Sequence, residues 1–344
     1  MKYLLNKNKI LFIIWIPIFT FILIITLYRT NYSVITTGDI TNLSSLINVE
    51  GEYNSSGSMN SVFVYSNDRI SLFQKWATSL DPNAYLYTES DSYLEFSDAE
   101  IYKMGVIQKN QSIEASVITA YNSAKEIDNT INIPYTFKGL IVSYLYKSDG
   151  MQFKLGDIIT SINGVDASSG RDALKKAYKG MLEGSSVKIL RDGVEYDLVL
   201  NESSSLYYKD DSLYTHINYY EKYDVKYSEG SPKISIGSSG TTGPSAGLMQ
   251  TLAIYNKLTE TDYTYGMRVV GTGTIDLDGN VGEIGGIEQK VVAAFKNNAD
   301  IFLCPLANYS DGYKQYQKLG SKRERMAFVC VHTFSDALEA LANA

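Results

Sequence analysis

A glycine-rich turn between an apolar strand and an amphipathic helix most constrains the fold of this chain. Ile234-Ser235-Ile236 alternates as a strand does, and residues 237–243 read Gly-Ser-Ser-Gly-Thr-Thr-Gly. Pro244 follows, and proline is favoured in the first turn of a helix. Apolar residues then recur at helical spacing at Leu248, Leu252 and Tyr255. The pattern predicts a strand, a glycine loop and a helix in succession, with Ser245 in the first helical turn.

Ser245 is a candidate nucleophile because of that position. Free backbone N–H groups and the positive end of the helix dipole gather in the first turn. A hydroxyl there can attack a carbonyl while neighbouring N–H groups hold the developing oxyanion. A serine in such a loop can equally be a simple helix cap. The chemical interpretation therefore requires a base.

Lys290 is the candidate base. Gly285-Gly286 is expected to open a helix whose apolar stripe holds Ile287 and Val291, and Lys290 lies at the edge of that stripe. A lysine among apolar groups loses solvation, which lowers its pKa toward the range of a general base. Most lysines beside apolar stripes instead extend to water.

The two segments together resemble the proteolytic domain of the Lon family, whose enzymes use a serine–lysine dyad. The resemblance covers residues 204–344 and includes Gly243-Pro244-Ser245-Ala246-Gly247-Leu248 and Gly285-Gly286-Ile287-Glu288-Gln289-Lys290. It implies Ser245 as nucleophile and Lys290 as base, with support from Thr272, Gly243 and Ala246. It also implies protein or peptide substrates and, by analogy, a homo-oligomer such as a hexamer.

The sequence departs from the ATP-driven members of that family in two ways. Thr242 stands where they usually have aspartate, and no G-x-x-x-x-G-K-[ST] loop occurs in the chain. We therefore expect proteolysis without ATP, and no cofactor.

Residues 135–203 resemble a PDZ domain. Gly156-Asp157-Ile158-Ile159 and Ile162-Asn163-Gly164 match the most recognisable segment of that family, and residues 137–142 fall at its carboxylate-binding loop. The resemblance implies that a peptide tail adds as a strand beside residues 140–144. Its carboxylate would be held by the backbone at Gly139, Leu140, Ile141 and Val142. The alternative is a β-rich spacer without a ligand.

An uncharged run from Ile10 to Tyr28 predicts a membrane anchor. Its nineteen residues are dense in isoleucine, leucine and phenylalanine, and such a helix is about long enough for the ~30 Å hydrocarbon core. Lysines before the run predict a cytoplasmic amino end, a single-pass protein of the cell membrane and an extracytoplasmic bulk. A cleaved signal peptide is the alternative.

The expected fold class is therefore an α+β multidomain chain. Residues 1–30 are predicted to form a cytoplasmic tail and transmembrane helix, and residues 31–134 an extracytoplasmic region packing with the PDZ module. Residues 135–203 are predicted to form the PDZ-like β-rich module, and residues 204–344 the α/β protease domain. Residues 98–126 show helical spacing but indicate no chemistry.

Composition narrows the remaining classes of partner. The net charge is −7, which disfavours nucleic acid as a partner. Cys304 and Cys330 lie in apolar strand-like runs, where buried thiols are favoured over a disulfide, and their spacing matches no metal site. His216 and His332 lie in no motif that would favour a Ser-His-Asp triad.

Together these features predict a membrane-anchored serine endopeptidase that cleaves unfolded or flexible extracytoplasmic proteins chosen by the PDZ module. The alternative is a catalytically silent, membrane-tethered scaffold that binds peptides.

Overall fold

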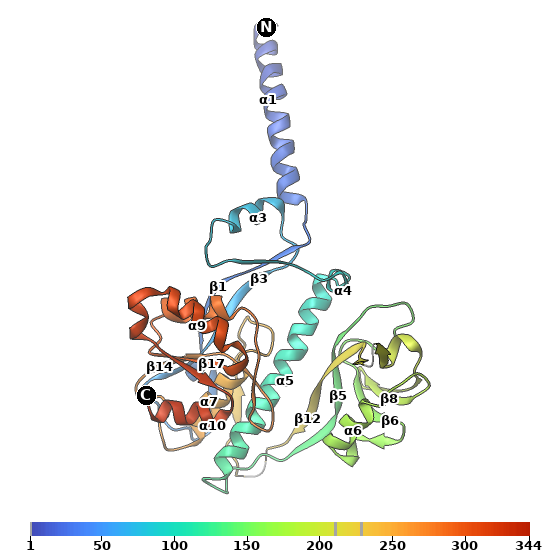
Figure 1. The fold of residues 1–344 in the computed structure, drawn as a ribbon, viewed down its shortest axis with the longest axis vertical. Helices are drawn as coiled ribbons and strands as arrows, with labels where there is room; N and C mark the ends of the chain where they lie inside the picture. The colour runs from blue at the N-terminus through green and yellow to red at the C-terminus, as the bar shows by residue number, and fades with distance from the viewer. Residues whose placement is uncertain (1, 210–211, 228–229) are drawn as a thin grey trace.

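A long central helix, α5 (Asp98–Lys125), lies between two bodies of the molecule. The computed structural model describes residues 2–209, 212–227 and 230–344, and the side chains of these apart from 2–11, 91–92, 208–209 and 212–213. Ser97 and Glu100 form a capping box at the start of α5, which satisfies N–H groups that a helix leaves free. In Figure 1 the body with the carboxyl terminus lies on one side of α5 and the second body on the other.

The first body is a six-stranded mixed sheet in the order β18-β17-β14-β3-β1-β4. Its strands are β1 (Tyr32–Asn42), β3 (Ser58–Asn67), β4 (Tyr85–Thr88), β14 (Arg268–Gly271), β17 (Ile301–Pro305) and β18 (Ala327–Val331). β3, β14, β17 and β18 run parallel to one another, and β1 and β4 add antiparallel pairs. All residues of β17 are buried, as expected for a strand covered on both faces.

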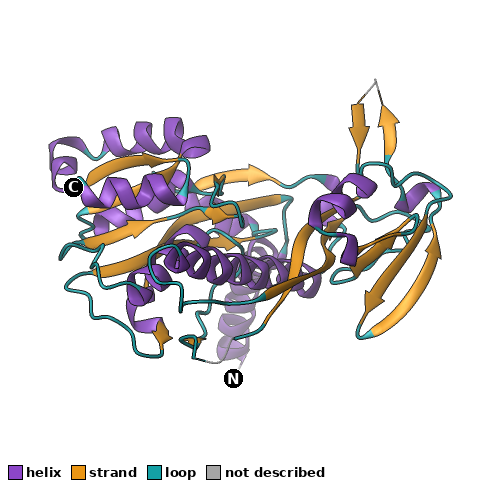
Figure 2. Ribbon diagram, turned by 90° about the horizontal axis from the view of Figure 1, so that it is seen from below, coloured by secondary structure: helices purple, strands orange, loops and turns teal. Residues whose placement is uncertain are grey.

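Helices cover both faces of this sheet. They are α7 (Gly247–Leu258), α8 (Ile287–Lys296), α9 (Tyr309–Lys318) and α10 (Phe334–Ala342). α5, α7 and α10 share one apolar core with the sheet, and α8 contributes to a second core built around Phe302 and Val270. The layered arrangement is visible edge-on in Figure 2. It brings the ends of α7, α8 and β14 together, where the predicted site residues lie.

The second body is built on an antiparallel sheet in the order β12-β5-β6-β8-β9, with β7 paired to β6. Its elements are β5 (Tyr135–Leu145), β6 (Ile158–Ile162), β7 (Val165–Asp166), α6 (Arg171–Tyr178), β8 (Ser186–Arg191), β9 (Val194–Val199) and β12 (Ile217–Val225). It has its own apolar core, to which α5 contributes Met104 and Ile107. We call this body the β-module.

The remaining elements of the described chain lie outside the two sheets and the helices named above. They are α1 (Lys2–Leu27), α2 (Leu43–Leu46), β2 (Ile47–Val49), α3 (Leu72–Thr78), α4 (Asp91–Leu94), β10 (Tyr207–Lys209), β11 (Ser212–Tyr214), β13 (Ile234–Ile236), β15 (Thr274–Ile275) and β16 (Val281–Gly282). Four 3₁₀ turns span Ala167–Ser169, Glu202–Ser204, Leu306–Asn308 and Gly320–Arg325.

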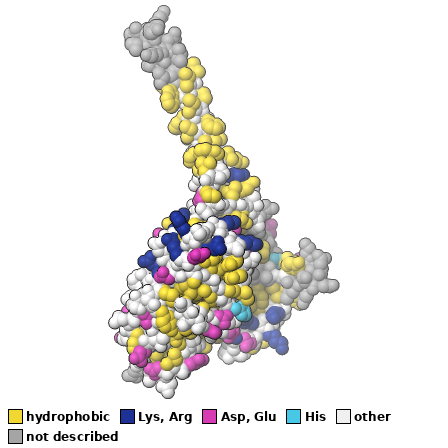
Figure 3. Space-filling view, turned by 60° about the vertical axis from the view of Figure 1, so that its left-hand side comes forward, with side chains coloured by type: hydrophobic (Ala, Val, Ile, Leu, Met, Phe, Trp, Pro, Cys, Tyr) yellow, Lys and Arg dark blue, Asp and Glu magenta, His cyan; other side chains and the backbone are white. Residues whose placement is uncertain are grey.

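The prediction of a membrane anchor at residues 10–28 was wrong. None of the helices in the described residues is long and apolar enough to cross a membrane. α1 ends at Leu27 and holds Pro17. Apolar side chains from Phe12 to Leu27 are exposed along the projecting helix (Figure 3).

The predicted location was wrong together with the anchor. Single-pass insertion, a cytoplasmic amino end and an extracytoplasmic bulk all depended on that helix.

The predicted fold class was wrong as well. β1, β3 and β4 come from residues 31–134, yet they extend the sheet that holds β14, β17 and β18. β3 pairs in parallel with β14 through Met59 and Val269, two buried residues far apart in sequence. Residues before and after the β-module therefore build one α/β sheet, which local sequence patterns cannot reveal because strand pairing over such distances is non-local.

Candidate active site

Ser245 lies in the turn that precedes α7. The helix begins at Gly247, so the prediction that Pro244 opens the helix was wrong by one turn. The Ser245 carbonyl is bonded from outside the helix, by the backbone N–H of Gly273 at 2.8 Å. Gly243 has a φ of +85°, a backbone conformation that favours glycine and turns the loop toward Ser245. Half-buried Ser245 is thus held by its backbone, and within the described residues its hydroxyl makes no hydrogen bond.

Lys290 lies on α8 and is only 2% exposed. Its Nζ lies 3.1 Å from Oγ1 of Thr272, to which it donates a hydrogen bond. Burial lowers the pKa of Lys290 to about 7, because an ammonium in apolar surroundings loses its hydration. Lys290, which the sequence places at the apolar edge of a helix, therefore points inward, and its amine is about half neutral near pH 7.

Thr272 connects the two. Its side chain is fully buried, and its Oγ1 donates to the carbonyl oxygen of Ser245 at 3.0 Å. A hydroxyl has one hydrogen, so Thr272 accepts from Lys290 while donating to Ser245. The lone pair of a neutral Lys290 amine is therefore not consumed by Thr272. The structure brings Ser245, Thr272 and Lys290 into one hydrogen-bonded chain that runs through the backbone of Ser245.

The backbone N–H groups around Ser245 differ in whether they already donate a hydrogen bond. Within the described residues, those of Ser245 and Ala246 donate no hydrogen bond, whereas that of Gly243 donates to the carbonyl of Gly105 at 2.9 Å. Free N–H groups beside a nucleophile can hold a developing oxyanion. Of the three predicted supporting residues, Ala246 offers such a group, Gly243 shapes the loop, and Thr272 bonds to both Lys290 and Ser245.

Residues on α5 escaped the sequence analysis. Lys109 Nζ donates to the carbonyls of Ser239 and Thr241 at 2.8 and 2.9 Å, and Ser112 Oγ donates to the Pro244 carbonyl at 2.9 Å. Ser116 Oγ donates in the same way to Gly247 at 3.0 Å. These three residues are at helical spacing and lie on one face of α5. A stripe of polar residues within an otherwise apolar helix is the sequence signal that could have identified them.

The predicted peptide-binding residues lie on β5, in the β-module. Leu140 and Ile141 pair with Ile159 and Ile158 of β6 along one edge of β5. Along the other edge, residues 139–145 pair with β12, so the edge where a peptide was expected holds a strand of this chain. Gly139 has a φ of +139° and a Cβ there would meet the Ile159 carbonyl at 2.2 Å, which explains the glycine.

β12 also contacts α6. Lys175 of α6 forms a 2.7 Å ion pair with Glu221, and Tyr178 Oη donates to the Ile217 carbonyl at 2.8 Å. The rings of Tyr178 and Tyr219 pack edge to face at 4.6 Å. β12 therefore contacts both β5 and α6.

Two cavities flank the nucleophile loop. One of about 540 Å³ is lined by Thr242 and Gly243 together with Tyr87, Tyr93 and Asp68, and another of about 340 Å³ is lined by Pro244, Ile275 and Tyr219, among others. The first cavity thus lies beside Thr242 and Gly243 and the second beside Pro244, and Ser245 lines neither.

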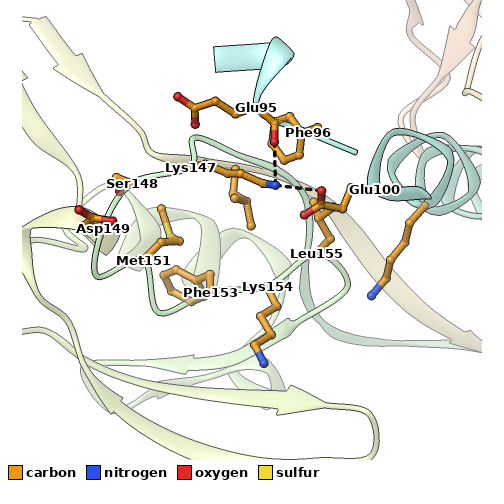
Figure 4. Close-up of a pocket in the computed structure, with 12 residues that line it drawn as sticks. Glu95, Phe96, Glu100, Lys147, Ser148, Asp149, Met151, Phe153, Lys154 and Leu155 are labelled. Carbon is orange, nitrogen blue, oxygen red and sulfur yellow. Dashed lines mark hydrogen bonds and ion pairs between the residues drawn. The ribbon is translucent and has the colours of Figure 1, made fainter. Parts of the chain in front are cut away.

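A wider cavity of about 770 Å³ lies elsewhere, where the start of α5 meets the β-module. In Figure 4, Lys147 reaches across it to the Glu95 carbonyl and the Glu100 carboxylate, at 3.0 and 2.9 Å. Neither Ser245 nor Lys290 lines this cavity.

Comparison with known proteins assigns the second half of the chain. Residues 203–343 match the family model of the Lon protease (S16) C-terminal proteolytic domain. This part of the chain is similar to the Lon-type proteolytic domain. The match agrees with the predicted class of enzyme, a serine endopeptidase.

Individual relatives agree with the family match. The chain is 33% identical to the Lon protease of Campylobacter jejuni over 123 residues, which are 36% of this chain and 14% of that protein. It is 29% identical to Lon protease 2 of Borreliella burgdorferi over 181 residues, 51% of this chain and 20% of that protein. The chain thus spans a fifth or less of these relatives' length. The Lon-type match begins after α5, so the polar stripe on α5 lies outside it.

In the described residues, His216 and the two cysteines form no hydrogen bond with Ser245, Thr272 or Lys290. A ring nitrogen of His216 lies 2.8 Å from the Ser205 carbonyl, and the ring stacks on Tyr207 of the β-module. Cys304 and Cys330 are free thiols, paired in register on β17 and β18, and burial raises the pKa of Cys304 to about 12. The preference for thiols over a disulfide is confirmed.

Proposed function

We propose that this chain is a serine endopeptidase in which Ser245 is the nucleophile and Lys290 the general base. The observation that carries the proposal is the burial of Lys290 beside Thr272, whose hydroxyl also holds the backbone of Ser245. A lysine with a pKa of about 7 is half neutral near pH 7 and can take a proton there.

The reaction is acyl transfer. Neutral Lys290 accepts the hydroxyl proton of Ser245 as the serine oxygen attacks the peptide carbonyl. The N–H groups of Ser245 and Ala246 stabilise the negative oxygen that forms. Lys290 then gives its proton to the leaving amine, and water hydrolyses the acyl-enzyme. This step requires the Ser245 hydroxyl and the Lys290 amine to come within hydrogen-bond reach of each other.

The substrates are unfolded or flexible proteins, cleaved without ATP. The sequence holds no G-x-x-x-x-G-K-[ST] loop that would cradle a nucleotide phosphate, so unfolding by a motor is not part of the proposal. The cavities on either side of the nucleophile loop, about 540 and 340 Å³, favour an extended substrate.

The β-module is proposed as a PDZ-like substrate-selecting unit. Its support is the Gly139–Val142 segment beside α6, the arrangement in which a PDZ domain binds a peptide strand. Because β12 fills that position, a substrate peptide binds at Gly139–Val142 only when β12 leaves.

Hydrolysis of a loosely folded protein such as a dye-labelled casein, without ATP, tests the proposal. The full chain should release labelled peptides, and Ser245→Ala and Lys290→Met should release none above background. Circular dichroism of each variant controls for folding. Cleavage by either variant at the parent's rate would refute the dyad, and no cleavage by a folded parent would favour a peptide-binding scaffold.

A further inference from the structure

The segment from Ser239 to Gly247 is bonded to one face of α5 at successive points. Lys109 Nζ donates to the Ser239 carbonyl, the Ser239 hydroxyl and the Thr241 carbonyl, at 2.8, 3.0 and 2.9 Å. Further along, the Gly105 carbonyl accepts from the Gly243 N–H at 2.9 Å. Ser112 and Ser116 then hold the carbonyls of Pro244 and Gly247.

Close packing accompanies these bonds. A Cβ on Gly105 would lie 2.9 Å from the Thr242 side chain, and a Cβ on Gly247 would lie 2.8 Å from Ser112 Oγ. Both distances are shorter than real Cβ contacts, so glycine is needed on each side of the contact. The loop and α5 are therefore fitted to one another over the whole stripe.

The hydrogen bond from Ser112 to the Pro244 carbonyl sets the direction of the backbone N–H of Ser245. The peptide unit between Pro244 and Ser245 is planar and trans, so its carbonyl and its N–H point in opposite directions. Ser112 holds the Pro244 carbonyl toward α5. The N–H of Ser245 consequently points away from α5, where the described residues leave it without an acceptor.

Lys109 acts earlier in the loop. Residues 237–243 include three glycines. In the described residues, the three hydrogen bonds from Lys109 are the only ones that a charged side chain makes to this segment. Because glycine loses more conformational freedom on ordering than other residues, such a loop needs external partners to keep one shape. A charged donor makes stronger bonds to carbonyls than a neutral one.

We propose that Lys109 and Ser112 of α5 are positioning residues, which hold the nucleophile loop so that Ser245 presents both its hydroxyl and its N–H to the substrate. The inference rests on the proposed function of Ser245. The inference makes activity depend on residues of α5, which precede the segment 203–343 that matches the Lon-type domain. The Lon-type domain of this chain is then catalytically complete only with α5.

Kinetics of full-length variants test the proposal. Lys109→Met keeps the length and the apolar stem of the side chain but removes its donors, and should lower kcat on dye-labelled casein about 10- to 100-fold, because a small misplacement of reacting groups has effects of that size. KM should stay within about twofold, since the substrate surface is unchanged. Lys109→Arg, which restores donors, should recover most of kcat. Ser112→Ala should lower kcat about tenfold.

Lys103→Met is the matched control on the same helix. Lys103 is exposed and, in the described residues, forms no hydrogen bond or ion pair, so its loss should leave kcat unchanged. The rate of labelling by a fluorophosphonate serine probe should fall with kcat in Lys109→Met and Ser112→Ala. Unchanged kcat in both would overturn the proposal, as would a loss in Lys109→Met that arginine does not recover. Ser245→Ala that still cleaves casein would instead refute the proposed nucleophile.

Discussion

Lys290 Nζ lies 3.1 Å from Oγ1 of Thr272, and that hydroxyl has already given its single hydrogen to the carbonyl of Ser245. The threonine therefore orients the amine by accepting from it, and leaves the amine lone pair to another partner. The same side chain fixes the base and the backbone of the proposed nucleophile.

Replacing Thr272 by valine tests this relationship. Valine has nearly the same shape, so the buried site keeps its packing while Lys290 loses its acceptor. The loss of one hydrogen bond at a buried group is worth about 1–3 kcal/mol, so kcat should fall roughly 5- to 150-fold. Thr272→Ser keeps the hydroxyl and should stay near the parent. Equal rates for valine and serine variants would show that the hydroxyl is dispensable.

The pH dependence of kcat should report Lys290. Only the neutral amine can accept the serine proton, and burial lowers the pKa of Lys290 to about 7. Casein hydrolysis should therefore rise with pH through a midpoint near 7 and then level off. A rise centred above pH 9, where an exposed lysine titrates, would contradict a buried base.

The same lowered pKa makes a stability prediction with a definite sign. Between pH 7 and about 10.4 the unfolded chain binds a proton at Lys290 that the folded chain lacks, so this group makes the free energy of unfolding rise with pH across that window. Lys290→Met lacks this dependence. Its melting temperature relative to the parent should consequently be highest at pH 7 or below and decrease toward pH 9. A difference that stays constant with pH would mean that Lys290 is not buried as described.

Within the β-module, Asp157 is 1% exposed and is held by two hydrogen bonds from Arg191, at 2.7 and 2.6 Å. Arg191→Met leaves a buried carboxylate without its charged partner and should lower the free energy of unfolding by about 3–5 kcal/mol. Lys188→Met is the control, because its ion pair with Asp197 spans 3.8 Å between exposed side chains. That control should change stability by less than about 1 kcal/mol. Urea titration of both variants gives the comparison.

A synthetic peptide of residues 217–225 tests whether β12 occupies the peptide position of the β-module. β12 already pairs with β5 and contacts α6, so the labelled peptide should not bind the intact chain at micromolar concentration. Fluorescence anisotropy measures this, with a scrambled peptide as control. Saturable binding of the true sequence alone would show that β12 exchanges readily with a free strand.

Short sequence segments were sufficient to select the three residues of the proposed site. Ser245, Thr272 and Lys290 lie in short segments whose spacing is characteristic, and the structure brings these segments together around β14 and α8. The start of α7 was misplaced because Gly273 takes the Ser245 carbonyl, a contact with a residue outside the helix.

Non-local contacts account for what the sequence did not reveal. Lys109 and Thr241 are far apart in the chain, and nothing in residues 98–126 indicates which loop they face. β12 was assigned no role because its partner β5 lies about eighty residues earlier in the chain, and the pattern of residues 217–225 does not name that partner. The anchor was predicted from the uncharged run alone, whereas none of the helices in the described part of the chain is long and apolar enough to cross a membrane.

Labelling of Ser245 by a fluorophosphonate probe, followed by mass spectrometry of the intact and digested chain, tests whether Lys290 activates this serine. One adduct is expected on the parent, on the peptide that contains Ser245, with a labelling rate that rises through pH 7. No adduct is expected on folded Lys290→Met over the same period. Labelling of Lys290→Met at the parent's rate, or an adduct on another residue, would contradict the claim that a buried lysine activates this serine.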